Sequence, residues 1–395
     1  MGERRGQRAG ADRLTAGTGP ATVSARRVES TMGRALQIPR APDEVGLDWL
    51  NAALSHGARS GQPSVAAVWV EVFRGSGMAM ISQLARLHLT YEPEGAQAPP
   101  TLILKLASTY PQAAEFAAAQ HYYEREVGVY RVLAPQGGLP APVCYWCDFD
   151  PGTGRFGILL ADLGHLACED MLSGISNPRL DVAGAGLADL HARWWGSPSL
   201  DAYDWLPAGN WEPQHAMIEG YRQLWPVFWE RFGPTLPEGS IRFGHSAADA
   251  MHQCLDELVR GPTTLAHRDF RLDNLFFEGT PERLVAVDWQ MASRMVGTYD
   301  VACLLTQSTS VQLRRERQWE VLRAWHDRVR SKVATPYSYE DAVADYRRSG
   351  LVGLLKPVFG GAYHEPGDAR GDQLLAVVNE RAFCAAIDLG LEDLL

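Results

Sequence analysis

The hydrophobic and polar positions between residues 64 and 163 predict a small β-rich unit. The runs "SVAAVWVEVF" and "MAMISQLARLHLTY", joined by "RGSG", predict a hairpin, and the second run alternates in part between apolar and polar positions. The apolar run "TLILKLA" predicts a third strand. Two more strands, "APVCYWCDF" and "RFGILLADL", are predicted on either side of the turn "DPGTG". We therefore expect five antiparallel strands in this part of the chain.

One helical pattern interrupts these strands. The run "PQAAEFAAAQHYYEREVGVYRVLA" begins with a proline, which suits the first turn of a helix. Glu126, Tyr130 and Leu133 follow a helical spacing, so Glu126 lies on the apolar face, whereas Glu124 projects elsewhere. The strand "TLILKLA" carries one charge, Lys105, in its middle, and a lysine there should have an anionic partner. Glu126 is the stronger candidate for this partner.

Helical patterns dominate the rest of the chain. "DVAGAGLADLHARWWG", "QHAMIEGYRQLWPVFWERF" and "SAADAMHQCLDELVRG" place apolar residues at spacings of three or four. Only the short strands "TTLAH", "NLFF" and "LVAV" are set among them, and the turn "EGTPER" joins the last two. We therefore expect an α+β fold with a tail of residues 1–40, a first lobe of residues 41–160 and a mainly helical lobe of residues 161–395.

Composition limits the class of protein. The 395 residues are 46% hydrophobic and 21% charged, which is typical of a globular protein with two core-bearing units. The sequence has no long apolar run and no signal segment, so we expect no membrane span and a cytoplasmic address. The six cysteines are too few for a disulfide framework, and Cys144 and Cys147 lack the second pair or nearby histidine of a zinc site.

The net charge of −10 is unevenly distributed. Residues 1–40 contain eight arginines against three acidic residues, so the remaining body is strongly acidic, which argues against nucleic acid as the main partner. The Gly- and Arg-rich start has no apolar period and predicts a disordered extension, although a basic arm could also bind a partner. Met1 and Met32 both remain candidates for the natural start.

The stretch "LAHRDFRLDNLFF", residues 265–277, interrupts buried-strand patterns with four charged residues, a histidine and an amide. Charges in such a place usually have a ligand or a partner. Asn274 precedes one strand of the predicted hairpin and Asp288 follows the other, so both emerge at the same end, which the loop containing Asp269 also feeds. Two carboxylates and an amide form an incomplete oxygen set that suits Mg²⁺ with phosphate and water ligands.

"HRDFRLDN" followed by "VDW" resembles the H-R-D-x-x-x-x-N loop and the D-F-G element of the protein-kinase-like superfamily. "VDWQ", "LADLHARWWG" and "GTYDVACLL" are closer to the clan of aminoglycoside phosphotransferases and choline kinases, and within it to phosphotransferase-family and ecdysteroid-kinase-like enzymes. The resemblance extends from about residue 64 to the carboxyl end. It implies a bilobal kinase-like fold that transfers the γ-phosphoryl group of ATP or GTP, with Mg²⁺, to a hydroxyl of a small molecule.

The resemblance also implies roles for individual residues. Asp269 would be the catalytic base, Asn274 and Asp288 would hold Mg²⁺, and Asp300 would steady the catalytic loop. The remaining residues would serve the nucleotide. Lys105 would bind its phosphates and be positioned by Glu126, Gly75, Ser76 and Gly77 would cover the phosphates, and the backbone near Asp162 would meet the base.

The sequence departs from the family pattern at two places. The third glycine of G-x-G-x-x-G is absent, and Arg268 stands where small-molecule kinases commonly have glycine. Arg271 could either touch phosphate or pair with Asp273. Protein phosphorylation is disfavoured because only eleven residues separate Asp288 from Asp300 and no A-P-E follows.

Several functional alternatives remain open at this stage. The acceptor could be an antibiotic or another natural product, or a metabolic choline-type or sugar-type compound, and the acidic body mildly favours a cationic one. A catalytically inactive nucleotide-binding relative is the rival from another class. The tryptophans of the helical part are Trp194, Trp195, Trp205, Trp211, Trp225 and Trp229, which could line a pocket or simply fill the core.

Overall fold

A computed structural model describes residues 36–57, 63–73, 81–95, 97–364 and 369–395 of the chain. The chain divides into two compact units, residues 1–36 and 37–395. Apart from its last residue, the first unit lies outside the described residues, and so does nearly all of the tail expected from the sequence.

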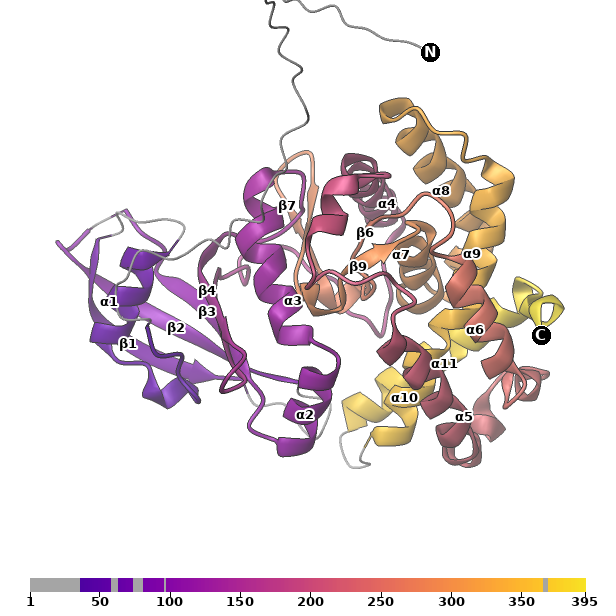
Figure 1. The fold of residues 1–395 in the computed structure, drawn as a ribbon, viewed down its shortest axis with the longest axis horizontal. Coiled ribbons are helices and arrows are strands. Elements are labelled where there is room, and N and C mark those ends of the chain that lie inside the picture. The colour runs from indigo at the N-terminus through magenta and orange to yellow at the C-terminus, as the bar shows by residue number, and fades with distance from the viewer. Residues whose placement is uncertain (1–35, 58–62, 74–80, 96, 365–368) are drawn as a thin grey trace, which may run out of the picture. The chain divides into compact units, whose positions relative to one another are not determined.

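A five-stranded antiparallel sheet occupies the first half of the larger unit (Figure 1). Its strands are β1 (Ser64–Val72), β2 (Ser82–Glu92), β3 (Thr101–Ala107), β4 (Cys144–Asp150) and β5 (Arg155–Ala161), in the order β1-β2-β3-β5-β4. In the central strand β3, Leu102, Leu104 and Leu106 are buried on one face, and Lys105 is buried on the other. The predicted number and direction of the strands are thereby confirmed.

The helix predicted after β3 is divided in two, so that part of the prediction is wrong. Helix α2 (Pro111–Ala119) ends before His121, whose φ of 53° is left-handed and interrupts the helix, and α3 (Tyr122–Gly128) begins directly afterwards. Helix α3 continues into a wide turn (Val129–Leu133) and contacts β4 and β5. A further helix that the sequence pattern had not indicated, α1 (Leu47–His56), packs against β1 and β4.

Helices form most of the second half of the chain. They are α4 (Asn177–Trp194), α5 (Glu212–Phe232), α6 (Ala247–Glu257), α7 (Thr298–Cys303), α8 (Val311–Lys332), α9 (Tyr339–Gly353), α10 (Leu355–Tyr363) and α11 (Ala369–Asp388). Helix α4 packs against α8, α7 against α9, and α5 against α10. Trp194 and Trp225 are buried in the core. No helix in the described part of the chain is both long enough and apolar enough to span a membrane.

Two small antiparallel ladders lie among these helices. β6 (Thr264–Ala266) pairs with β9 (Ser293–Met295), and β7 (Leu275–Glu278) pairs with β8 (Arg283–Ala286). Leu275 lies opposite Ala286, and the backbone N–H of Val287 donates to the carbonyl of Asn274. Asn274 and Asp288 therefore stand at the same end of the β7–β8 hairpin, as the sequence predicted. The fold is the α+β, protein-kinase-like arrangement that was expected.

Candidate active site

A cavity of about 570 Å³ lies between the sheet and the β7–β8 hairpin. Its lining includes these residues that were singled out in the sequence: Lys105, Glu126, Asp162, Asp269, Asn274 and Asp288. The remaining candidates, Gly75, Ser76 and Gly77, lie outside the described residues. A second cavity of about 660 Å³, between α4 and the outer side of the hairpin, contains none of the predicted site residues. The titratable groups that could act on a nucleotide therefore converge on the first cavity.

Lys105 is held between two carboxylates. Its Nζ lies 2.7 Å from Glu126 Oε2 and 2.8 Å from Asp288 Oδ1. Burial disfavours the charged amine, but the charges of Asp288 and Glu126 overcome this and raise the pKa of Lys105 above its ordinary value. Burial also raises the pKa of Glu126, although Lys105 opposes the rise. Glu124 pairs with His121 in a half-exposed position, so the predicted choice of Glu126 as partner is confirmed.

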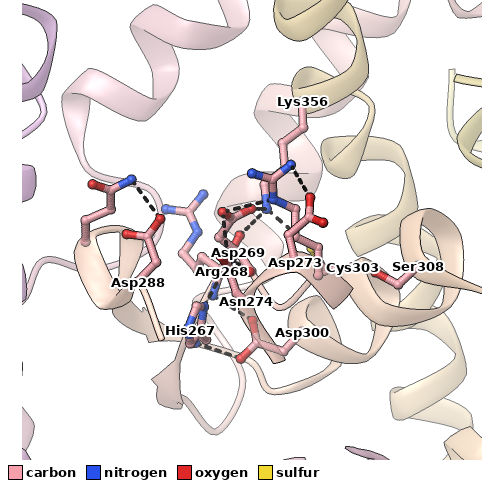
Figure 2. Close-up of polar contacts among 12 residues, drawn as sticks. His267, Arg268, Asp269, Asp273, Asn274, Asp288, Asp300, Cys303, Ser308 and Lys356 are labelled. Atoms are coloured by element: carbon pink, nitrogen blue, oxygen red, sulfur yellow. Dashed lines mark hydrogen bonds and ion pairs between the residues drawn. The ribbon is translucent and has the colours of Figure 1, made fainter. Parts of the chain in front are cut away.

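The carboxylate of Asp269 has partners on both of its oxygens (Figure 2). Lys356 Nζ lies 2.7 Å from Oδ1, and Oδ2 accepts from Asn274 Nδ2 at 3.1 Å with Arg271 Nε 3.4 Å away. Burial would raise the pKa of this carboxyl, but the positive charges of Lys356 and Arg271 hold it well below its ordinary value. Arg271 lies 3.7 Å from Asp273 as well, so it pairs with both carboxylates of the loop.

Lys356, on helix α10, was missed in the sequence. Its Nζ also donates to the backbone carbonyl of Arg268 and lies 3.3 Å from Cys303 Sγ. The signal that identified Lys105 was present here too, because "LVGLLKPVF" is an apolar run with one lysine. Lys356 fixes the direction in which the carboxylate of Asp269 points.

Replacement of Lys356 by methionine should lower the single-turnover rate by about 10–100-fold, since a misplaced catalytic group commonly costs this much. The nucleotide affinity should stay unchanged, because Lys356 does not contact Lys105 or Asp288. Lys356→Arg, which keeps the charge, should recover part of the rate. Equal rates for the wild-type and methionine proteins would show that Lys356 only stabilises the fold.

Asp300, on α7, anchors the start of the loop that carries Asp269. Its carboxylate accepts from the backbone N–H groups of His267 and Arg268, each at 2.7 Å, and lies 3.1 Å from His191 Nε2. Burial opposes ionisation, but these hydrogen bonds hold the pKa of Asp300 below its ordinary value.

Arg268 has a φ of 64°, in the left-handed region that glycine adopts without strain, so this residue is held in a costly conformation. This explains why glycine suits the position.

Asp300→Ala should destabilise the protein by about 3–5 kcal/mol, because it leaves two backbone donors and an imidazole buried without their acceptor. Asp300→Asn keeps one oxygen acceptor and should cost less. Urea unfolding of the variants measures both values. A loss of no more than about 0.5 kcal/mol for the alanine variant, the range of an ordinary surface change, would contradict this anchoring role.

The end of the hairpin offers oxygen atoms to a cation. Asn274 Nδ2 donates to the carbonyl of Asp269 at 2.9 Å, and no described residue donates a hydrogen bond to Asn274 Oδ1. Asp288 has a φ of 66°, and its carboxylate engages Lys105 and, at 3.4 Å, Gln290. An amide oxygen and a carboxylate at the mouth of one cavity fit a hard divalent ion that takes its other ligands from phosphate and water.

Asp162 stands where β5 leaves the sheet. Its carboxylate accepts from Arg86 Nε at 2.6 Å and from the backbone N–H of Gly164 at 2.9 Å. The side chain is therefore engaged, and the role expected of the neighbouring backbone stays a prediction. Ile103, Leu160 and other apolar side chains line this part of the cavity, and such a surface suits a flat ring.

Comparison with known proteins places this site in a family context. Residues 81–334 match the phosphotransferase enzyme family. A comparison with curated proteins finds no match. A protein of Ralstonia eutropha JMP134, provisionally described as an aminoglycoside phosphotransferase, shares 17% identity with a TM-score of 0.51, over 87% of this chain and 97% of that chain. A microcompartment-associated aminopropanol kinase shares 15% identity with a TM-score of 0.53, over 89% of this chain and 99% of that one. At these identities the likeness concerns the fold.

Proposed function

Because the chain belongs to the phosphotransferase enzyme family, we propose that it moves the γ-phosphoryl group of ATP or GTP to a hydroxyl group of a small molecule. The class of the enzyme, a small-molecule kinase, follows from the family, and the donor and acceptor are the proposal. One observation carries it. Lys105, the loop that carries Asp269 and Asn274, and Asp288 come from three separate segments and line the same cavity.

The donor side of the site would be formed by Lys105, Asn274 and Asp288. Lys105 already carries its charge between two carboxylates, so nucleotide phosphates would meet an ammonium that is in place. Asn274 and Asp288 would hold Mg²⁺, which when bound supplies charge neutralisation for the phosphates. The apolar wall of the cavity beside Asp162 would contact the nucleobase.

The acceptor side would be organised by Asp269. Its carboxylate is ionised and would accept a hydrogen bond from the acceptor hydroxyl, directing the oxygen at the γ-phosphorus. The oxygen–phosphorus bond forms as the bond to the bridging oxygen of the diphosphate breaks, the proton passes to Asp269, and the nucleoside diphosphate leaves. The low pKa of Asp269 makes it a weak base, so its main contribution would be orientation.

A nucleotide-consumption assay over a panel of metabolites and natural products tests the proposal. The panel should include aminoglycosides, macrolides, nucleoside antibiotics, choline and simple sugars, because resistance and metabolic roles are both compatible with the site. Acceptor-dependent release of nucleoside diphosphate supports a kinase. Nucleotide binding without turnover for any acceptor would favour the inactive relative.

Asp288→Asn should weaken the affinity for the Mg²⁺–nucleotide complex by about tenfold or more, because it removes a formal charge from the metal site and nearly preserves its shape. Without Mg²⁺ the nucleotide affinity should not fall, because the variant also removes the negative charge of Asp288, which competes with the phosphates for Lys105. Titration calorimetry measures both values. Glu282→Gln, in the turn at the other end of the same hairpin, is the control. An unchanged Mg²⁺-dependent affinity would show that the metal assignment is wrong.

A further inference from the structure

Two buried arginines beside the site carry charge without a carboxylate partner. Arg125, on α3, is 1% exposed and donates to the carbonyls of Gln120 and Gln290 at 3.0 and 3.2 Å. Arg268 is 2% exposed and donates to Gln214 Oε1 at 2.9 Å and to the carbonyl of Gly209 at 3.5 Å. Within the described ranges no carboxylate forms an ion pair with either guanidinium. The carboxylate that acts on Arg125, from Glu124, does so from a half-exposed position.

Hydrogen-bond donors in this cluster are also unsatisfied. The Nε atoms of Arg125 and Arg268 and the indole Nε1 of Trp211 are buried and have no acceptor among the described residues. The ring of Trp211 lies 5.2 Å from the guanidinium of Arg125, and the ring of Tyr299 lies 5.1 Å from that of Arg268. Aromatic faces offset only part of the cost of burying a cation. The cluster therefore favours a negative charge nearby.

Tyr122 connects this cluster to the active site. Its phenol is buried, lines the nucleotide cavity and lies 5.8 Å from the guanidinium of Arg125. Burial raises the pKa of Tyr122 to about 12, while the positive charges of Arg125, Arg268 and Lys356 lower it and Asp269 raises it. Arg268 directly precedes Asp269, and Lys356 Nζ contacts both residues, so the cation cluster borders the Asp269 carboxylate.

The cations near Asp269 are only partly paired. Arg271 and Lys356 pair with the carboxylates of the loop, Asp269 and Asp273, whereas Arg125 and Arg268 have no carboxylate partner among the described residues. Neither Arg125 nor Arg268 lines the nucleotide cavity, so these two are not placed to bind the phosphates directly. The acidic body of the protein had favoured a cationic acceptor, but distant surface charges are screened over about 8 Å at physiological salt, so the buried local charges decide.

We propose that the acceptor carries an anionic group, such as a carboxylate or a phosphate, close to the hydroxyl that is phosphorylated. This inference rests on the proposed kinase function and names the class of its acceptor. Lys356, 18% exposed at its side chain, is the cation that such a group would approach, and Arg125 and Arg268 supply the positive field behind it. A cationic acceptor would meet like charge in a low-dielectric setting and be disfavoured.

Acceptors that share a carbon skeleton but differ in charge test this inference. The probes are 3-hydroxybutyrate, its neutral amide and 4-amino-2-butanol, together with glycerate, glycerol and 3-amino-1,2-propanediol. The nucleotide-bound protein should show a higher melting temperature with the hydroxy acids than with the amino alcohols, and should phosphorylate them at least tenfold faster. No melting shift with either hydroxy acid, or equal or better turnover of the amino alcohols, would overturn the inference. A melting shift without turnover of any acceptor would count against the kinase function instead.

A charge variant separates the acceptor from the nucleotide. Arg268→Gln should lower the ratio of kcat/KM for hydroxy acid over amino alcohol by about tenfold and leave nucleotide affinity unchanged. Arg381→Gln is the matched control, because Arg381 is also buried and donates to the carbonyls of Met171, Leu172 and Gln307, away from Asp269. If nucleotide affinity fell by the same factor as this ratio, the charge of Arg268 would act on the triphosphate and not on the acceptor, and the inference would be overturned. The comparison on the wild-type protein stands even if Arg268→Gln fails to fold.

Discussion

Asp269→Asn should reduce the rate of phosphoryl transfer by about 10²–10⁴-fold, because it removes the carboxylate that orients the acceptor hydroxyl and accepts its proton. Nucleotide affinity should stay within a few fold, because the Asp269 carboxylate contacts Lys356, Asn274 and Arg271 and not Lys105. The melting temperature should change little, since the amide has the shape of the carboxylate. Single-turnover measurements with an acceptor from the panel give the rate of the chemical step directly.

A second carboxylate of the same loop provides the control for this variant. Asp273 is 41% exposed at its side chain and pairs with Arg271, so Asp273→Asn should keep most of the rate. A variant that retains more than about a tenth of the wild-type rate would have lost less than the smallest amount expected for a general base. In that case the role given to Asp269 must be abandoned.

Lys105→Met should lose both nucleotide affinity and rate. The affinity should fall by about 100-fold or more, because the variant removes the buried cation that would bind the phosphates and leaves Glu126 and Asp288 without their partner. Calorimetry with a non-hydrolysable nucleotide measures the affinity. Lys332→Met, which removes an exposed lysine that pairs with Asp189, should bind nucleotide like the wild type. Wild-type affinity in Lys105→Met would place the phosphates elsewhere.

The sequence predicted those features that depend on residues close together in the chain. The apolar run "TLILKLA" coincides with β3, and the spacing of Glu126 on its helix identified the partner of Lys105. The helix break at His121 could not be predicted, because no glycine or proline marks it. The rings of His121 and Trp211 form a T-shaped contact with their centroids 5.5 Å apart, so contacts with a distant segment accompany the left-handed turn.

The parts of the site that were missed depend on distant packing. Lys356 lies 87 residues beyond Asp269 in the chain, and its position follows from the packing of α10 against α5. Helical periodicity gives the buried face of a helix but not the neighbour that the face meets. The buried arginines without a carboxylate partner were missed for the same reason. Total charge counts surface carboxylates equally with the buried Arg125 and Arg268.

The position of Lys356 has a consequence for how the enzyme can change. The family match ends at residue 334, and every residue assigned to the nucleotide and the metal precedes that point, whereas the ammonium that orients Asp269 follows it. A fragment that ends there would keep the recognisable signature and lose part of the catalytic apparatus. Under the proposed function, exchange of the last helices between relatives would replace the group that orients Asp269 and leave Lys105, Asn274 and Asp288 in place.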